Sequence, residues 1–271
     1  MTQKILITGS SAGFGTLTTE HLLKARHRVA ASMREPRGRN AGVAERLEKA
    51  GAMIATIDVT DDASVEQGVA AAIDALGGLD VVINNAGLGV TGLAESFTPE
   101  DFRRLFDINV FGVQRMIRAT APVFRAQRSG LFIHVSSLLG RMTMPFYGPY
   151  CASKWALEAL AENYRTELSA FGIETAIVEP GGFATTFMDN LMRPSDRSRE
   201  SEYGELAGAP EAALRGFHEL LANSPAQDPQ NVRAPSSTWS SGPRANDRCA
   251  RSSTRSAWAT RSRHTTSSFM H

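Results

Sequence analysis

Apolar residues gather in six short runs along most of the chain. The runs cover residues 4–8, 28–32, 52–57, 79–84, 131–136 and 174–179. Each run is continuous rather than alternating, which is typical of strands that are buried on both faces of a parallel sheet. Segments with helical spacing of apolar residues lie between them, around residues 20–26, 43–49, 65–76, 102–117 and 155–168. This alternation predicts a single α/β domain with a doubly wound parallel sheet in three α/β/α layers.

The periodic pattern ends near residue 232. Residues 233–271 contain no Ile, Leu or Val, while seven Arg, ten Ser and five Thr accompany one acidic residue, Asp247. Such a segment cannot bury enough apolar surface to offset the entropy lost on ordering. We therefore predict a domain over residues 1–232 and an atypical, poorly ordered Arg/Ser/Thr-rich tail over residues 233–271.

A shifted reading frame is one explanation of the tail. Back-translation of residues 231–266 with GC-rich codons, read from the third base, permits a product with helical periodicity followed by a strand. We hypothesise that a single-nucleotide shift near residue 232 replaced a final helix and an edge strand. Sequencing the source locus tests this hypothesis, and an unshifted frame through residue 271 would contradict it.

Composition and charge exclude several classes of protein. The formal net charge of +1 gives no field to attract nucleic acid or acidic lipid. No segment approaches the roughly 20 apolar residues of a membrane span, and no cationic leader precedes the first run. Cys151 and Cys249 lack metal-ligand spacing, so no metal site is expected. We predict a cytoplasmic protein that binds neither nucleic acid nor a membrane.

A glycine-rich turn follows the first apolar run. The stretch ITGSSAGFG, residues 7–15, leads directly into the first helical segment. Gly9, Gly13 and Gly15 let backbone amides and the helix N-terminus approach a pyrophosphate group. An ordinary glycine turn is the alternative, but the position directly after a strand favours a Rossmann-type dinucleotide site, in which Ser11 and Phe14 would take part.

A tyrosine and a lysine stand four positions apart in GPYCASKW, residues 148–155, where a helix is expected to begin. Residues at this spacing share one face of a helix. A free phenol has a pKa near ~10, so proton transfer at neutral pH needs a nearby cation to stabilise the phenolate. Tyr150 and Lys154 could form such a proton-transfer unit, or a core aromatic beside a solvated charge.

Five motifs, taken in order, resemble the short-chain dehydrogenase/reductase family over residues 3 to about 230. They are the Gly-x-x-x-Gly-x-Gly turn, Asn84-Asn85-Ala86-Gly87, Asn109 in DINVFG, Ser137, and Tyr150-x-x-x-Lys154. The resemblance implies that Tyr150 is the general acid or base and that Lys154 stabilises its phenolate. It implies that Ser137, rather than its neighbour Ser136, hydrogen-bonds the substrate oxygen. Asn109 would lie in the fourth helix and hold a water linked to Lys154.

The same resemblance implies a set of cofactor contacts. Asp58 would lie near the adenine, although a helix cap is its alternative role, one that Thr60 or Asp61 could also fill. Thr185 would meet the nicotinamide carboxamide, with Thr186 as a weaker alternative. The full set implied is Gly9, Ser11, Gly13, Phe14, Gly15, Arg34, Asp58, Val59, Asn85, Ala86, Gly87, Tyr150, Lys154, Pro180, Gly181 and Thr185.

The end of the second apolar run indicates which nicotinamide cofactor is used. An acidic residue there would bind the ribose 2′-hydroxyl and repel a 2′-phosphate. The chain has Met33 followed by Arg34, with Arg37 and Arg39 nearby, and a guanidinium can bind a phosphate bidentately. NADP(H) is therefore expected over NAD(H). Glu35 is the competing feature, because its carboxylate could still reach the ribose.

The resemblance implies an oxidoreductase that acts on a carbonyl or secondary alcohol, in a homo-oligomer, either dimer or tetramer, built on the fourth and fifth helices. The loops expected around the substrate are apolar and rich in Met, which favours a small hydrophobic substrate. Cys151 has no His partner and is expected to pack rather than react. The alternative function is a non-catalytic NADPH-binding regulator with the same fold, and the intact Ser137, Tyr150 and Lys154 argue against it.

Overall fold

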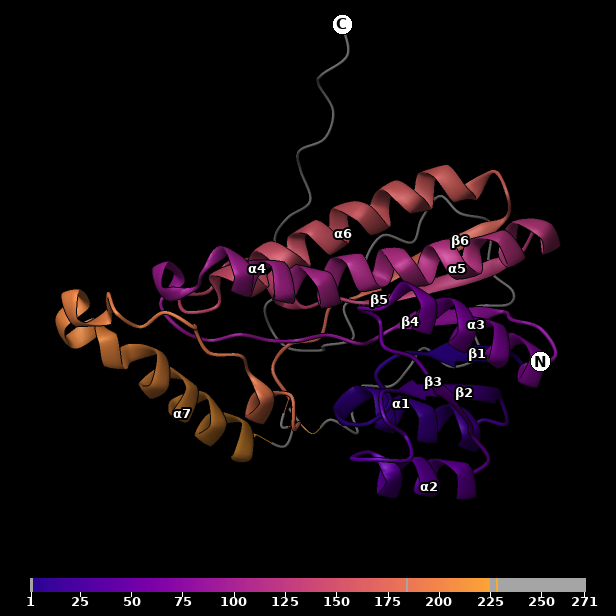
Figure 1. Ribbon diagram of the computed structural model, residues 1–271, viewed down its shortest axis with the longest axis horizontal. Helices are drawn as coiled ribbons and strands as arrows, with labels where there is room; N and C mark the ends of the chain where they lie inside the picture. Colours follow the sequence, from indigo (N-terminus) through magenta and orange to yellow (C-terminus); the bar gives the residue numbers. More distant parts are fainter. Residues whose placement is uncertain (1, 184, 225–227, 229–271) are drawn as a thin grey trace, which may run out of the picture.

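The computed structural model describes residues 2–183, 185–224 and 228 (Figure 1). Within these residues, six parallel strands form one sheet in the order β3-β2-β1-β4-β5-β6. Their bounds are β1 Lys4–Ile7, β2 Arg28–Met33, β3 Met53–Thr56, β4 Val81–Asn84, β5 Gly130–Val135 and β6 Ile173–Val178. Each predicted run thus overlaps a strand, and the predicted doubly wound fold is confirmed. The domain limit at residue 232, the tail with its hypothesised frameshift, and Cys249 lie outside the described residues and stay predictions.

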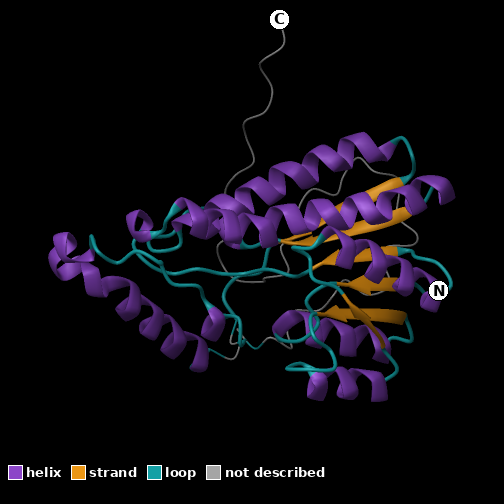
Figure 2. Cartoon of the chain, in the orientation of Figure 1, coloured by secondary structure: helices purple, strands orange, loops and turns teal. Residues whose placement is uncertain are grey.

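Helices cover both faces of the sheet (Figure 2). On one face, side chains of α3, α5 and α6 pack against the strands, and on the other face α1 and α2 do so. A last helix, α7, projects away from the sheet in Figure 1. The bounds are α1 Gly13–Lys24, α2 Ala41–Lys49, α3 Asp62–Leu76, α4 Pro99–Phe106, α5 Gly112–Gln127, α6 Gly148–Ser169 and α7 Ala209–Ala222.

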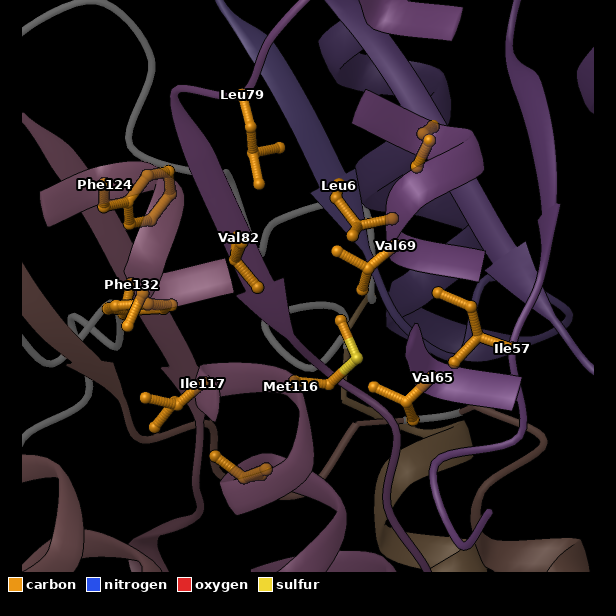
Figure 3. Packing of buried hydrophobic residues seen from close by; sticks show 14 of the residues in the cluster. Leu6, Ile57, Val65, Val69, Leu79, Val82, Met116, Ile117, Phe124 and Phe132 are labelled. Atoms are coloured by element: carbon orange, nitrogen blue, oxygen red, sulfur yellow. The ribbon is translucent and has the colours of Figure 1, made fainter. Parts of the chain in front are cut away.

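The largest core cluster lies between the sheet and the face formed by α3, α5 and α6 (Figure 3). Leu6, Val82 and Phe132 of the strands are fully buried there. The ring of Phe124 on α5 packs 5.0 Å from the ring of Phe132, between centroids. A Cβ at Gly130 would lie 2.3 Å from the Phe124 ring, so this strand start requires glycine. Each such buried side chain stabilises the fold by roughly 1.5–3 kcal/mol.

The segment expected as one helix around residues 102–117 is instead two α-helices joined by a π-helical turn. Thr98 and Asp101 form a capping box that begins α4 at Pro99. The π turn covers Asp107–Phe111 and leads directly into α5. Such turns insert one extra residue into a helix and are frequent at functional sites. Asn109 therefore lies in this turn, not in a regular helix as predicted.

Candidate active site

The glycine-rich turn connects β1 to α1 at the carboxyl edge of the sheet. Gly9 and Gly13 have positive φ angles of 71° and 52°, which favour glycine. A Cβ at Gly15 would lie only 2.1 Å from the carbonyl oxygen of Gly9, so any side chain would break the turn. The Asn85 side-chain amide donates to the carbonyl oxygens of Thr8, at 2.9 Å, and Gly9, at 3.2 Å. Asn85 and its neighbour Ala86 thus hold the turn in place.

The N-terminus of α1 has the features of an anion site. Its cap residue, Ala12, offers no side-chain hydrogen bond, and the first turn contains no acidic residue. Backbone N–H groups and the positive end of the helix dipole therefore stay available to a negatively charged group. A dinucleotide pyrophosphate fits this turn. Ser11 is half-buried in it, and the ring of Phe14 meets that of Phe183 edge-on at 5.5 Å.

Arg34 and Asp58 follow neighbouring strands, β2 and β3, and face each other. Their charged groups are 3.8 Å apart, with 51% and 34% of the side chains exposed. Burial acts to raise the pKa of Asp58, but hydrogen bonds from Thr60 and the charges of Arg34 and Arg39 outweigh it, so the net pKa is lowered. The competing carboxylate, Glu35, pairs with Arg39 at 3.6 Å.

Asp61, and not Asp58, caps the N-terminus of α3. Its carboxylate accepts a hydrogen bond from the backbone N–H of Ser64 at 2.6 Å and begins α3. Among the residues that the structure describes, Thr60 donates hydrogen bonds to the Asp58 carboxylate at the sheet edge, and Arg34 pairs with it at 3.8 Å. Val59, next along the chain, packs against Gly112, whose Cβ would lie 2.9 Å away, and so supports the start of α5.

Ser137 and Tyr150 meet at the carboxyl end of β5. The Ser137 hydroxyl lies close enough to the Tyr150 hydroxyl to act on its pKa, which it tends to lower, and its oxygen accepts from the backbone N–H of Leu139 at 3.1 Å. The Tyr150 ring is 8% exposed and packs in an apolar cluster with Val90, Phe97 and Leu105. By contrast, the Ser136 hydroxyl points to Glu158, to which it donates at 2.5 Å. The structure thus brings Ser137, and not Ser136, to the tyrosine.

Lys154 lies one helical turn after Tyr150 on α6. Its Nζ atom is 5.7 Å from the centroid of the Tyr150 ring and donates to the carbonyl oxygen of Val135 at 2.8 Å. Burial lowers the pKa of Lys154 to about 8, while the carboxylate of Glu158 acts in the opposite direction. Burial also raises the pKa of Tyr150 well above its ordinary value, although the neighbouring Ser137 hydroxyl acts to lower it. The phenol therefore holds a proton that it can donate.

Asn109 completes this group from the π turn. It is 1% exposed, its Oδ1 accepts from the Leu88 N–H at 2.8 Å, and its Nδ2 donates to the Leu88 carbonyl at 2.9 Å and to Ser153 at 3.0 Å. Gly87 lies between Asn109 and Lys154, because a Cβ there would be 3.5 Å from Oδ1 and 3.8 Å from Nζ. Four of the predicted residues, Asn109, Ser137, Tyr150 and Lys154, thus converge on one edge.

The segment after β6 closes the other side of the site. The Pro180 carbonyl accepts from the Leu138 N–H at 3.0 Å, and a Cβ at Gly181 would lie 3.3 Å from the Leu138 side chain. Thr185 is half-buried and faces Gly13 across the turn, where a Cβ would lie 3.7 Å from Thr185, whereas Thr186 is exposed. Thr185 is thus the threonine placed next to the glycine turn.

A strap follows, defined here as residues 187–194. Val90 and Met192 form a parallel β-bridge, and the ring of Phe187 lies 5.9 Å from that of Tyr150. Leu138, Met142 and Met144, in the segment between β5 and α6, are 38%, 50% and 41% exposed. The surroundings of the two hydroxyls are therefore apolar.

Two buried polar groups next to the site were not predicted. His134 on β5 is fully buried, and its Nδ1 is 3.3 Å from the Asn84 side-chain amide. Burial and the charge of Lys154 lower its pKa to about 4. Glu158, which binds Ser136, is 2% exposed. Glu158 could have been found by continuing the helical spacing from Tyr150 through Lys154, whereas nothing in the sequence distinguished His134 from a strand residue.

Other features of the described residues bear on the remaining predictions. Cys151 is free, 2% exposed and has the environment of a packing residue. In the parts of the chain that the structure describes, no helix is long and apolar enough to cross a membrane. The same residues contain no group of three or more His, Cys, Asp or Glu side chains arranged to hold a metal ion. The cytoplasmic location stays a prediction.

Curated relatives share this sequence pattern. The chain is 39% identical over 188 residues to 3-ketodihydrosphingosine reductase of Bacteroides thetaiotaomicron, an alignment that covers 69% of this chain and 66% of that relative. It is 32% identical over 245 residues to human retinol dehydrogenase 8, which covers 84% of this chain and 74% of the relative.

Solved structures share the fold. A short-chain dehydrogenase from Streptomyces avermitilis superposes with a TM-score of 0.69 at 29% identity, over 85% of this chain and 81% of that one. A gluconate 5-dehydrogenase from Burkholderia cenocepacia, solved with NADP and tartrate, has a TM-score of 0.63 at 28% identity over 68% and 73%. The model of a protein family described as "short chain dehydrogenase" matches residues 3–196. The chain therefore belongs to the short-chain dehydrogenase family of nicotinamide-dependent oxidoreductases.

Proposed function

We propose that this protein transfers a hydride between NADP(H) and the carbonyl or secondary alcohol of a small hydrophobic substrate. The observation that carries the proposal is the pairing of the Ser137 and Tyr150 hydroxyls above buried Lys154, inside an apolar cluster. No general acid is needed for mere binding of a dinucleotide. Two hydroxyls that lie next to each other in a water-poor site can instead bind one substrate oxygen.

Each residue has a distinct role in carbonyl reduction. The bound nicotinamide supplies the hydride that reaches the carbonyl carbon. Tyr150 gives its proton to the carbonyl oxygen, and Ser137 donates a hydrogen bond to the same oxygen as negative charge develops there. The ammonium of Lys154 stabilises the phenolate that remains on Tyr150. In alcohol oxidation the phenolate accepts the proton, so the same atoms act in reverse.

The preference for NADP(H) rests on Arg34. Its guanidinium is half-exposed at the end of β2, where it can reach a ribose 2′-phosphate, and Glu35 is occupied by Arg39. Asp58 pairs with Arg34 at 3.8 Å, a contact that a 2′-phosphate could replace. Solved structures similar to this chain were obtained with NADP and with NAD. We therefore assign the choice to Arg34 and not to the fold.

The apolar surroundings of Tyr150 support a hydrophobic substrate. Phe187 and Met192 of the strap pack in the same cluster as Tyr150, and Met142 and Met144, between β5 and α6, are exposed. Several relatives carry names that refer to apolar compounds, namely a ketodihydrosphingosine, a retinol and a 17-beta-hydroxysteroid. A long-chain or polycyclic ketone is the first substrate class to test.

The test is oxidation of NADPH, followed by its absorbance, with a panel of long-chain, aromatic and polycyclic ketones and aldehydes. We expect turnover with at least one apolar carbonyl, reduced about 10³-fold in Tyr150→Phe because the proton donor is lost. Tyr164→Phe is the matched control, because Tyr164 is on the same helix but its hydroxyl binds Gln114 at 2.7 Å, away from the site. Tight NADPH binding without turnover across the panel would favour a non-catalytic regulator.

We further propose a homo-oligomer, dimer or tetramer, in which α5 and α6 pair with a second copy. Phe111, directly before α5, and Trp155 on α6 are large apolar side chains that are 52% and 50% exposed. Light scattering of the full chain and of Trp155→Glu tests this proposal. A monomeric wild-type protein would contradict it.

A further inference from the structure

Glu158 is a buried carboxylate for which the proposed reaction has no use. It lies on α6 one turn beyond Lys154, and it is 2% exposed. Its Oε1 accepts a hydrogen bond from the Ser136 hydroxyl at 2.5 Å. The backbone of Gly140 lies directly against this pair, because a Cβ there would be 2.0 Å from Oε1 and 2.7 Å from the Ser136 hydroxyl oxygen. The contact is thus closed on all sides by chain segments that carry the active site.

Arg141 extends this contact to a third segment. Its Nε atom lies 2.5 Å from Oε2 of Glu158 and 2.9 Å from Oε1 of Glu179. Glu179 is 7% exposed and directly precedes Pro180 in the segment after β6. The guanidinium also reaches Glu162, at 3.5 Å, on the exposed side of α6.

One network, made of the buried Ser136, Glu158 and Glu179 and the half-exposed Arg141, thereby joins the three segments on which the proposed reaction depends. Ser136 precedes Ser137 at the end of β5, Glu158 shares α6 with Tyr150, and Glu179 leads into the segment that reaches Thr185. Removing a carboxylate from water costs free energy, and well-packed apolar side chains would often be more stable in its place. The network therefore needs an explanation other than stability.

We propose that Glu158 is a positioning residue that fixes the Ser137 hydroxyl relative to the Tyr150 hydroxyl. It acts by holding Ser136 against α6, so that the two groups that bind the substrate oxygen keep a constant separation. This inference rests on the proposed function. Misplacement of a reacting group by about 1 Å can reduce a rate by up to roughly 10²-fold, so a tether of this kind has a measurable effect.

The experiment compares Glu158→Gln, Ser136→Ala and the double variant with the wild-type enzyme. Glutamine keeps the volume, but because Arg141 can only donate, the amide oxygen turns toward Arg141 and the donor amide toward Ser136, so that the Ser136 hydroxyl loses its acceptor. Glu162→Gln is the matched control, because Glu162 is on the same helix and contacts the same arginine without touching Ser136. The readouts are kcat for ketone reduction and the Kd of NADPH, which also verifies that each variant is folded.

We expect Glu158→Gln and Ser136→Ala each to lower kcat roughly 10-fold with the Kd of NADPH within about 2-fold, and Glu162→Gln to resemble wild type. Because Glu158 acts through Ser136, adding Glu158→Gln to Ser136→Ala should lower kcat by less than about 2-fold. A full additional loss in the double variant would overturn the tether, as would an unchanged kcat in both single variants.

Two further outcomes are also decisive. If Glu158→Gln does not fold, Ser136→Ala decides alone, and wild-type kcat in that variant rejects the inference. If the wild-type enzyme shows no turnover with any carbonyl, the proposed function itself fails and the positioning role falls with it. That result is distinct from an active wild type whose Glu158 and Ser136 variants are equally active.

Discussion

The polar groups at one end of the carboxyl edge of the sheet are exposed to solvent, whereas those at the other end are buried. At the β2–β3 end, Arg34 and Asp58 are 51% and 34% exposed and stand 3.8 Å apart. At the β5–α6 end, Lys154 and Asn109 are 5% and 1% exposed, and each makes a short hydrogen bond to the backbone. Exposed charges are exchanged at little cost to folding, whereas buried ones are costly and coupled. We infer that the first end determines cofactor choice and the second determines the chemistry.

The largest expected effect is at the buried end, in Lys154→Met. Methionine has a similar volume and removes the buried charge, so we expect turnover to fall about 10³-fold through loss of phenolate stabilisation. We expect the melting temperature to stay the same or rise, because burial disfavours the ammonium, as its lowered pKa of about 8 indicates. Calorimetry beside the NADPH assay measures both. A large fall in melting temperature would show that the charge of Lys154 stabilises the fold. That result would contradict the view that the buried end is costly to folding.

The next effect is the acid stability of the buried end. The imidazole of His134 titrates near pH 6.5 when unfolded and near 4 when folded, because burial and Lys154 lower its pKa. Between these values the unfolded state binds more protons, so stability is lost as the pH falls through this window, by about 3 kcal/mol for this group alone.

Denaturant unfolding at several pH values measures this loss. His134→Asn should flatten the dependence between pH 6.5 and 4. An equal slope in wild type and His134→Asn would mean that other groups dominate acid unfolding.

The smallest effect is expected at the exposed end. Arg34→Ser should raise the KM for NADPH about 10-fold through loss of a charge-assisted contact, with the KM for NADH nearly unchanged. Arg37→Ser is the control, because its side chain is 87% exposed and pairs with Glu48 at 3.8 Å, and we expect a change below about 2-fold. If Arg34→Ser changes the KM for NADPH and the KM for NADH equally, Arg34 does not determine the choice of cofactor.

The sequence predicted the strands and the approximate helices because local periodicity encodes them. Each strand lies within or close to its predicted run, for example β3 at Met53–Thr56 within residues 52–57. The sequence could not decide whether Thr60 or Asp61 caps α3, because both side chains can accept a hydrogen bond and both lie just before the helix. The structure shows that Asp61 is the cap. Local alternatives of this kind differ by only about 1 kcal/mol, which a pattern cannot resolve.

Other features depended on contacts that are remote in sequence. The π turn could not be predicted, because the apolar spacing on both sides of Asp107–Phe111 also fits one continuous helix. Glu158 stood at a visible helical spacing, but its partners Ser136 and Arg141 lie in a strand end and a loop. Only the folded chain shows that the Glu158 carboxylate is buried between these segments. The proposed positioning role depends on that burial.

The π turn also limits how this chain can change in length. Deleting one residue from 107–111 would restore regular α-helical hydrogen bonding, but it would rotate α4 and α5 relative to each other by roughly 100°. Either the Asn109 amide would then leave Leu88 and Ser153, or Met116 and Ile117 would turn away from the sheet. The stretch can thus accept no single-residue deletion, which makes it a fixed reference point for aligning distant homologues.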